Sequence, residues 1–272
     1  MLIQLETYHG RSLGATHGSD GPTSISRGTY NAKRPEDDFI QAAGKVGYPE
    51  IVDLQNLDSN NGVERASHFI SSDGRRQDTA HVYLHPRLQD GKHPKLMVLV
   101  ESQVVRVLFE GNKASGVEYR PNPVFQSSDI KKSIKARRMV IISAGALGTP
   151  LILERSGVGE SELLAKLDIK VISDISGVGK NYQDHHLLAY PYHTSLDPSE
   201  TGDGVNTGRV DVAELMATNA SILGWNVQDV GAKLRPTDAE VEALGPAFKA
   251  VWDRDFKDDL NKPLLMMALI NA

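Results

Sequence analysis

A run of small residues between an apolar segment and a helix-forming segment constrains this chain more than any other feature. Residues 139–143 read as a buried β-strand, and residues 145–159 follow with the order Gly-Ala-Leu-Gly-Thr-Pro-Leu-Ile-Leu-Glu-Arg-Ser-Gly-Val-Gly. A strand that enters a helix through a turn of small residues can point backbone N–H groups at a phosphate. Ala144, Gly145 and Gly148 would leave the main chain accessible to a cofactor. The alternative is that these residues only let the helix pack closely on the strand.

Size and composition narrow the classes of protein that fit this sequence. With 272 residues, 40% of them hydrophobic, the chain can hold one large or two ordinary domains with a substantial core. A net charge of −5 and the lack of a long basic run argue against a nucleic-acid partner or an anionic membrane surface. The one basic stretch, residues 131–138, is interpreted as a solvated strand edge. No cysteine is present, so disulfides and thiolate chemistry are excluded and redox chemistry would need a bound cofactor.

Apolar periodicity and turn residues predict a mixed α/β fold. We expect helices at residues 35–47, 76–84, 148–155, 161–167 and 237–255. We expect strands at residues 23–26, 96–100, 104–109, 114–119 and 131–143, the third and fourth forming a hairpin, with 96–100 and the end of 131–143 fully buried. Pro86 should stop the second helix, and Pro246 should break or kink the last one, which Thr237 and Glu240 cap at its start. Residues 187–236 show no regular pattern.

The order of residues 145–159 resembles the second signature of the glucose-methanol-choline oxidoreductases, which are FAD enzymes acting on alcohols and related donors. Residues 177–185, Gly-Val-Gly-Lys-Asn-Tyr-Gln-Asp-His, are similar to the run that family members place shortly after this signature, beside the flavin. Residues 17–22 and 74–79 resemble two further family segments, which we interpret as fold elements. Across its length the chain is most similar to the alcohol (methanol) oxidase branch, including residues 6–9 and 233–237.

This resemblance implies FAD as the cofactor, a small-molecule alcohol and oxygen as substrates, and oxidation of a primary alcohol to an aldehyde by hydride transfer to the flavin. It implies a substrate-side region at residues 1–94, the second part of the FAD-binding domain at 95–190, and an incomplete substrate-binding or cap region at 191–272. Val104 would contact the adenine through its main chain, although it is nearly as well explained as a core valine. The cofactor-binding residues that the resemblance implies are Val104, Ser143, Ala144, Gly145, Thr149, Asn181, Asp184 and His185.

Two parts of the family pattern are not found in this sequence. The Gly-x-Gly-x-x-Gly fingerprint that seats the pyrophosphate is absent, and so is the C-terminal His-containing segment that removes the alcohol proton. We therefore nominate no catalytic residue, and we expect the chain to be an interior fragment, inactive alone and with weak or no flavin binding. The intact protein is expected to be intracellular, cytoplasmic or peroxisomal, without a membrane span, and could be a homo-oligomer.

Several alternatives stay open at this stage. An FAD-containing hydroxynitrile lyase shares the family, as do dehydrogenases and formate- or choline-type oxidases, and a truncated, non-catalytic binding module is a third class. A zinc site is disfavoured because His81 and His85 form the only helical histidine pair and lack a third ligand. Residues 10–14 match the Gly-x-Ser-x-Gly nucleophile elbow, but no strand and helix flank them, so we interpret this as a chance match.

Overall fold

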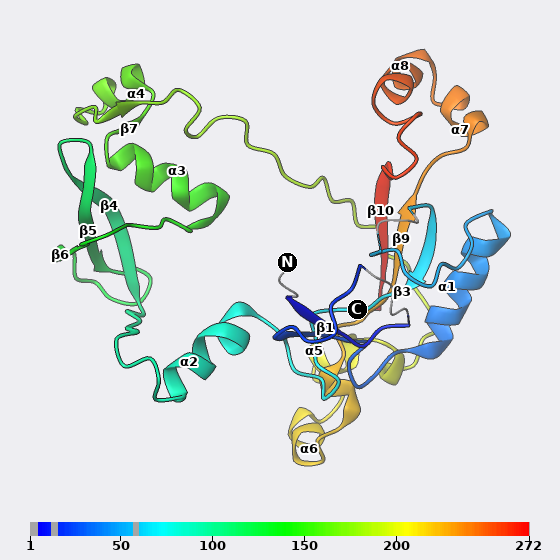
Figure 1. Ribbon diagram of the computed structural model, residues 1–272. Helices are drawn as coiled ribbons and strands as arrows, with labels where there is room; N and C mark the ends of the chain where they lie inside the picture. The colour runs from blue at the N-terminus through cyan, green and yellow to red at the C-terminus, as the bar shows by residue number, and fades with distance from the viewer. Residues whose placement is uncertain (1–4, 12–15, 57–59, 272) are drawn as a thin grey trace. The chain divides into compact units, whose positions relative to one another are not determined.

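The computed structural model describes residues 5–11, 16–56 and 60–271, which form two compact units. Unit 1 comprises Met1–Pro94 and Tyr192–Ala272, and unit 2 comprises Lys95–Pro191. Both contain helices and sheets, which confirms the mixed α/β class (Figure 1). The segment 10–14 with the elbow-like pattern lies largely outside the described residues.

Unit 1 is organised around a three-stranded antiparallel sheet with the order β10-β9-β3. Helix α1 packs on this sheet, as Figure 1 shows. The elements of unit 1 are β1 (Glu6–Tyr8), β2 (Thr23–Ile25), α1 (Lys33–Lys45), β3 (Gly62–Arg65), the π-helix η1 (Ala80–Leu84), α2 (His85–Gln89), the 3₁₀-helix η2 (Pro198–Glu200), α5 (Asp203–Asn206), α6 (Val212–Ala217), the 3₁₀-helix η3 (Ser221–Gly224), β9 (Gln228–Leu234), α7 (Asp238–Ala243), α8 (Pro246–Asp255) and β10 (Leu265–Ile270).

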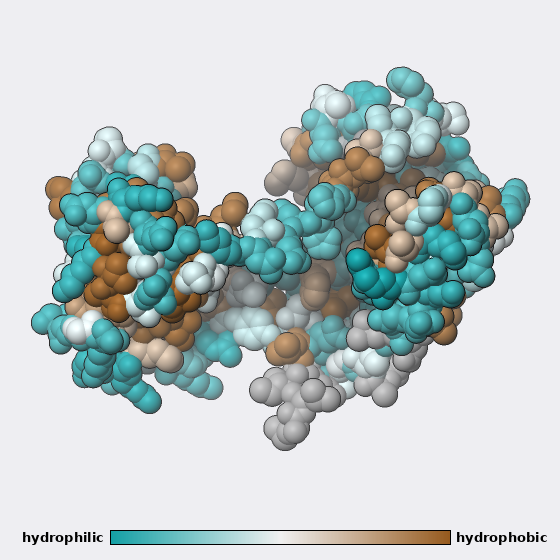
Figure 2. All heavy atoms as spheres, turned by 90° about the horizontal axis from the view of Figure 1, so that it is seen from above, coloured by the Kyte–Doolittle hydropathy of each residue, from teal (hydrophilic) through white to brown (hydrophobic). Residues whose placement is uncertain are grey.

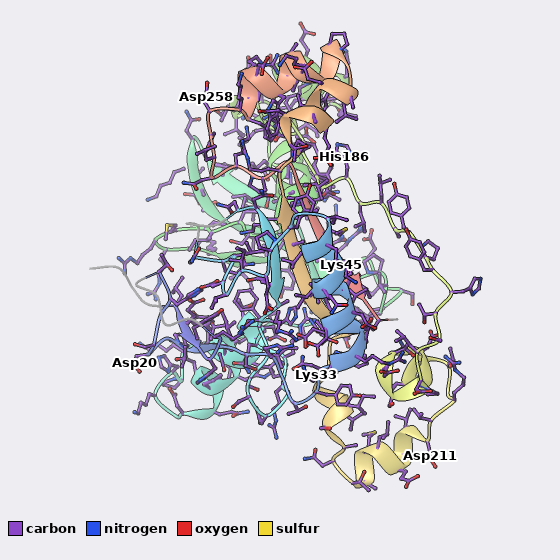
Figure 3. The ribbon with its side chains drawn as sticks, turned by 90° about the vertical axis from the view of Figure 1, so that its right-hand side faces the viewer. Asp20, Lys33, Lys45, His186, Asp211 and Asp258 are labelled. Atoms are coloured by element: carbon purple, nitrogen blue, oxygen red, sulfur yellow. The ribbon has the colours of Figure 1, made fainter. Side chains whose placement is uncertain are left out.

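The core of unit 1 lies between α1 and the sheet. Ile40 of α1 meets Val63 of β3 and Val230 and Ala232 of β9, and both valines are fully buried. Full burial of a valine side chain contributes roughly 1.5–3 kcal/mol. Lys33 and Lys45, labelled in Figure 3, mark the two ends of α1 and are exposed, so only one face of this helix is apolar.

Unit 2 consists of a hairpin extended by a third strand, with a helix packed on it. Strand order in this antiparallel sheet is β4-β5-β6, and a separate parallel pair joins β7 to β8. The elements are β4 (Ser102–Glu110), β5 (Lys113–Pro121), β6 (Lys132–Lys135), α3 (Gly145–Arg155), β7 (Val158–Gly159), α4 (Ser161–Lys166) and β8 (Ser173–Asp174). The predicted hairpin and the helices of residues 148–155 and 161–167 are thereby confirmed.

Two strands predicted to be buried are not strands in this structure. Residues 96–100 and 139–143 run as extended chain without strand pairing, and Met97 and Ile141 are 82% and 74% exposed. Of the predicted strand 131–143, only β6 forms. A fully buried strand needs hydrogen-bonded neighbours and helices over both faces, and the described part of the chain supplies no neighbouring strand. Apolar surface is correspondingly open to solvent on unit 2, coloured brown in Figure 2.

Two further predictions about elements were wrong. Pro86 does not stop the helical segment, because it occupies the first turn of α2. A backbone N–H at that position has no partner within the helix, so a proline is tolerated there. The region 187–236 is not irregular throughout, since it supplies α5, α6 and the central strand β9. Pro246 does separate two helices, and the predicted capping box of Thr237 and Glu240 is present at the start of α7.

A histidine held by two carboxylates joins the loops of unit 1. His17 Nδ1 lies 2.8 Å from Glu6 Oε1, and its Nε2 lies 2.8 Å from Asp53 Oδ2. The imidazole also stacks on Tyr8 with 3.7 Å between ring centroids. Burial alone would lower the pKa of His17, but the hydrogen bonds with the two carboxylates outweigh it, so the pKa lies above the ordinary value of 6.5.

This arrangement predicts a pH-dependent loss of stability in His17→Gln. A raised folded-state pKa means that the stabilisation by protonated His17 is complete below pH 6.5 and is lost as the pH rises through the folded-state pKa. The difference in unfolding free energy between wild type and His17→Gln should therefore be larger at pH 5.5 than at about pH 8.5, measured by urea denaturation. Exposed His186, labelled in Figure 3, provides the control His186→Gln. A difference that does not change with pH would contradict this interpretation.

Candidate cofactor site

The small-residue turn predicted from the sequence contributes to the lining of a cavity in unit 2. This cavity has a volume of about 450 Å³ and lies between β4 and α3, and the segment 140–144 forms part of its lining. Its lining is mainly apolar, with valines of β4 and β5 facing Ile152 and Leu151 of α3. A cleft of this volume, lined mainly by apolar side chains with a few polar groups, is the usual form of a small-molecule or cofactor site.

The turn itself leaves its main chain open to a ligand. Gly145, the first residue of α3, has φ +79°, and a Cβ added there would meet no heavy atom within 4 Å. Ala144 and Gly145 are exposed, and amides in the first turn of a helix have no partner within the helix. The Ala144 N–H donates to Thr149 Oγ1 at 3.1 Å, so the Thr149 hydroxyl holds the turn. The turn is thus fixed and accessible.

Three of the eight predicted cofactor residues line this cavity: Val104, Ser143 and Ala144. Val104 lies in β4 and is 37% exposed, so it is not a core valine here. The strand pairing shifts between Val104 and Arg106, which leaves Val105 as a bulge. A bulge bends the strand and frees main-chain groups from the ladder. The β4 main chain beside Val104 is therefore available to a ligand edge.

The other predicted residues lie outside the cavity lining. Gly145 and Thr149 belong to the adjoining turn and first helical turn, while Asn181, Asp184 and His185 lie on the exposed, extended chain after β8. Asn181 takes the left-handed backbone region with φ +54°, and its side-chain oxygen accepts from Gln183 Nε2 at 3.2 Å. The structure therefore does not bring Asn181, Asp184 and His185 to the cavity that Val104, Ser143 and Ala144 line.

Asp184 has its own hydrogen bonds on this extended chain. It accepts from the Tyr182 hydroxyl and from the His185 main-chain N–H, each at 2.8 Å. These bonds hold the pKa of Asp184 below its usual range. Asp184 therefore contacts the main chain of His185 and is ready to accept hydrogen bonds as a carboxylate.

Sequence reasoning missed several residues around the cavity. Gln103 and Arg155 add polar groups to its lining, and Val107, Val117 and Ile152 form its apolar walls. Alternation in the hairpin and the helical spacing of α3 could have indicated the apolar ones. Nothing in the pattern marked Gln103 or Arg155, because a polar residue at a strand start or a helix end is common on any surface.

The second half of the 145–159 pattern serves the fold. Gly157 has φ +86°, and a Cβ there would lie 2.2 Å from the Lys170 carbonyl oxygen, so only glycine fits. Gly157 O accepts from the Ile172 N–H at 2.7 Å, and the next two residues form β7, which pairs with β8. Residues 156–159 therefore connect α3 to the β7–β8 pair, whereas the first part of the pattern forms α3, which begins at the open turn.

Unit 1 contains a second, more open cavity of about 990 Å³. Phe69, Arg76, Asp78 and Trp225 are among its lining residues, and the segment 74–79 predicted as a fold element contributes to its wall. His81 and His85 lie near this segment with 4.8 Å between ring centroids, and the described residues include no group of three ligands suited to a metal ion.

No helix in residues 5–11, 16–56 and 60–271 is both long and apolar enough to cross a bilayer.

Residues 11–187 match the family model described as GMC oxidoreductase. The chain belongs to the GMC oxidoreductase family. This confirms the resemblance drawn from residues 145–159, and the cofactor of this GMC oxidoreductase is FAD. The open turn and the apolar cavity of unit 2 fit such a group, because the space around Gly145 is open and the cavity lining is mainly apolar.

Known relatives include alcohol-oxidising enzymes. An alcohol oxidase of Candida boidinii is 33% identical over 262 residues, which cover 94% of this chain and 39% of that protein. An oxygen-dependent choline dehydrogenase of Cronobacter sakazakii is 38% identical over 184 residues, covering 67% of this chain and 32% of that protein. The solved structure of an FAD-dependent oxidoreductase from Chaetomium thermophilum has 26% identity and a TM-score of 0.70, covering 85% of this chain and 41% of that one. The GMC chain thus spans about two fifths of the length of the curated alcohol oxidases it matches.

Proposed function

We propose that the protein to which this chain belongs oxidises a primary alcohol to the aldehyde and reduces oxygen to hydrogen peroxide. The observation that supports this most is the cavity between β4 and α3 beside the accessible turn at Ala144 and Gly145, in a chain similar to alcohol oxidases over nearly its whole length. FAD, when bound, accepts the hydride from the alcohol carbon and passes two electrons to oxygen.

In this proposal unit 2 holds the adenosine half of FAD. The β4 main chain at Val104 would bind the adenine edge, and the apolar walls from Val107 and Ile152 would exclude water from the ring. The turn from Ser143 to Gly145 would lie against the adjoining ribose or pyrophosphate. Main-chain groups suit this task because they bind a ring edge without a charged side chain in an apolar cavity.

The residues on the extended chain after β8 have a separate role in this proposal. Asn181, Asp184 and His185 would lie beside the flavin ring in the longer protein, with Asp184 as a hydrogen-bond acceptor. We assign no described residue to remove the alcohol proton, since a general base must come within hydrogen-bond reach of the substrate. We also propose that the exposed apolar segments 96–100 and 139–143 pair with strands of the longer protein.

Turnover of the intact protein with a panel of donors tests the reaction. We expect a short primary alcohol such as ethanol to give aldehyde and hydrogen peroxide in equal amounts, with matching oxygen uptake. Formate as the only active donor would contradict the proposed substrate class, whereas choline as the only active donor would narrow it, because choline is itself a primary alcohol. Cleavage of a hydroxynitrile to aldehyde and cyanide without oxygen uptake would identify a lyase, and a folded protein without flavin absorbance would favour a non-catalytic module.

A further inference from the structure

A buried serine hydroxyl joins the two elements that form the walls of the cavity. Ser156 follows the last residue of α3 and is 7% exposed. Its Oγ donates to the Ile152 carbonyl oxygen at 2.5 Å and accepts from the Val107 N–H of β4 at 2.8 Å. One side chain therefore ties the end of α3 to the middle of β4.

The bond to Val107 matters because β4 is an edge strand. Strand order is β4-β5-β6, so no strand among the described residues receives the N–H groups at the outer edge of β4. Val107 is 5% exposed, which places its N–H where water does not replace a lost partner. Without the Ser156 hydroxyl, this donor would be buried and unpaired, and the strand would have to move to satisfy it.

Ser156 also fixes the segment of β4 that carries the proposed adenine contact. The bulge at Val105 frees the strand from regular pairing between Val104 and Arg106, and the Ser156 bond holds it again at Val107. Val104, Val107 and Ile152 line the cavity, whereas Ser156 does not. Ser156 therefore affects the cavity indirectly, through the spacing between β4 and α3.

We propose that Ser156 is a positioning residue for FAD binding, which sets the width of the groove between the β4 main chain and α3. This inference rests on the proposed function of the cavity. It predicts that loss of the hydroxyl weakens FAD binding through the position of β4, although Ser156 does not contact the cofactor. The hydroxyl of threonine, on a slightly larger side chain, should preserve FAD binding, because a hydroxyl can both donate to the Ile152 carbonyl oxygen and accept from the Val107 N–H.

The test compares Ser156→Ala, Ser156→Thr and the control Ser161→Ala in the intact protein that contains this chain. Ser161 also lies in unit 2, and its Oγ donates to Asp174 at 3.1 Å, away from the cavity lining. We expect Ser156→Ala to raise the Kd for FAD about fivefold in a fluorescence titration. We expect hydrogen exchange at the Val107 amide of the FAD-free protein to rise in the same variant. Ser156→Thr and Ser161→Ala should leave both quantities near the wild-type values.

Two other results would overturn the positioning role of Ser156. An unchanged Kd in Ser156→Ala overturns the positioning role, even where Val107 exchange rises, because the bond would then be only structural. Should Ser156→Ala fail to fold, Ser156→Cys keeps a side chain of similar shape with a weaker acceptor and must show the same loss of affinity. Absence of FAD binding by the unsubstituted intact protein at millimolar FAD overturns the assignment of the cavity, and the positioning role with it.

Discussion

Substitution of Asp229 by alanine or asparagine is expected to lower the free energy of unfolding by about 3–5 kcal/mol. Asp229 is fully buried in β9, and its carboxylate accepts four hydrogen bonds. The donors are Asn31 Nδ2 at 3.0 Å, the Ala32 N–H at 2.9 Å, Trp225 Nε1 at 2.9 Å and Asn271 Nδ2 at 3.2 Å. Alanine would leave these donors unpaired, and the amide of asparagine would turn donors toward donors.

Urea denaturation of the two variants measures this loss. Asp258, labelled in Figure 3, is exposed, so Asp258→Asn serves as the control and should change stability by less than about 0.5 kcal/mol. A loss below about 1 kcal/mol in Asp229→Ala would show that water or rearrangement satisfies the four donors, and that Asp229 does not organise unit 1.

Substitution of Ala144 by tryptophan is expected to weaken FAD binding at least about thirtyfold, or about 2 kcal/mol. Ala144 lines the cavity of about 450 Å³ and is exposed, so an indole can enter the groove without disturbing the core. The melting temperature of the FAD-free protein should therefore change little. Flavin fluorescence during titration with FAD measures the affinity.

The matched control is Ala146→Trp. Ala146 is also exposed and lies two residues further along, in α3, but outside the cavity lining. Its substitution adds the same indole and should leave the Kd within about twofold of wild type. Equal losses of affinity in the two variants would show that the effect does not come from filling this cavity.

Local signals predicted much of the fold. The hairpin of β4 and β5, the helices α3 and α4, and the break at Pro246 depend on residues close together in sequence. Thr237 and Glu240 form the expected capping box because both partners lie within one helical turn. These elements therefore follow from propensity, caps and turn residues alone.

Elements that depend on distant partners were not predicted. Residues 96–100 and 139–143 have the composition of buried strands, but a strand forms only where another pairs with it, and composition does not reveal that. Strand β9 was missed because Asp229 interrupts its apolar pattern, and the four donors that make a buried aspartate acceptable come from remote segments. Burial of a charged residue cannot be inferred without those partners.

The candidate site shows the same division. The family resemblance implied Ser143, Ala144 and Val104, and the structure brings these three to one cavity. The polar residues Gln103 and Arg155 and the hydroxyl of Ser156 depend on how α3 meets β4, which no local pattern encodes. The roles of Asn181, Asp184 and His185 stay predictions.

Hydrogen exchange of the intact protein with and without FAD tests the central claim most directly, namely that the cavity between β4 and α3 is an FAD site. We expect saturating FAD to slow exchange in residues 102–107 and 143–152, the two segments that contain lining residues of that cavity from β4, the turn and α3. Segments around the larger cavity of unit 1, such as residues 68–79 and 223–226, should be unaffected. Protection confined to unit 1, or no protection of β4 and α3 at saturating FAD, would contradict the account.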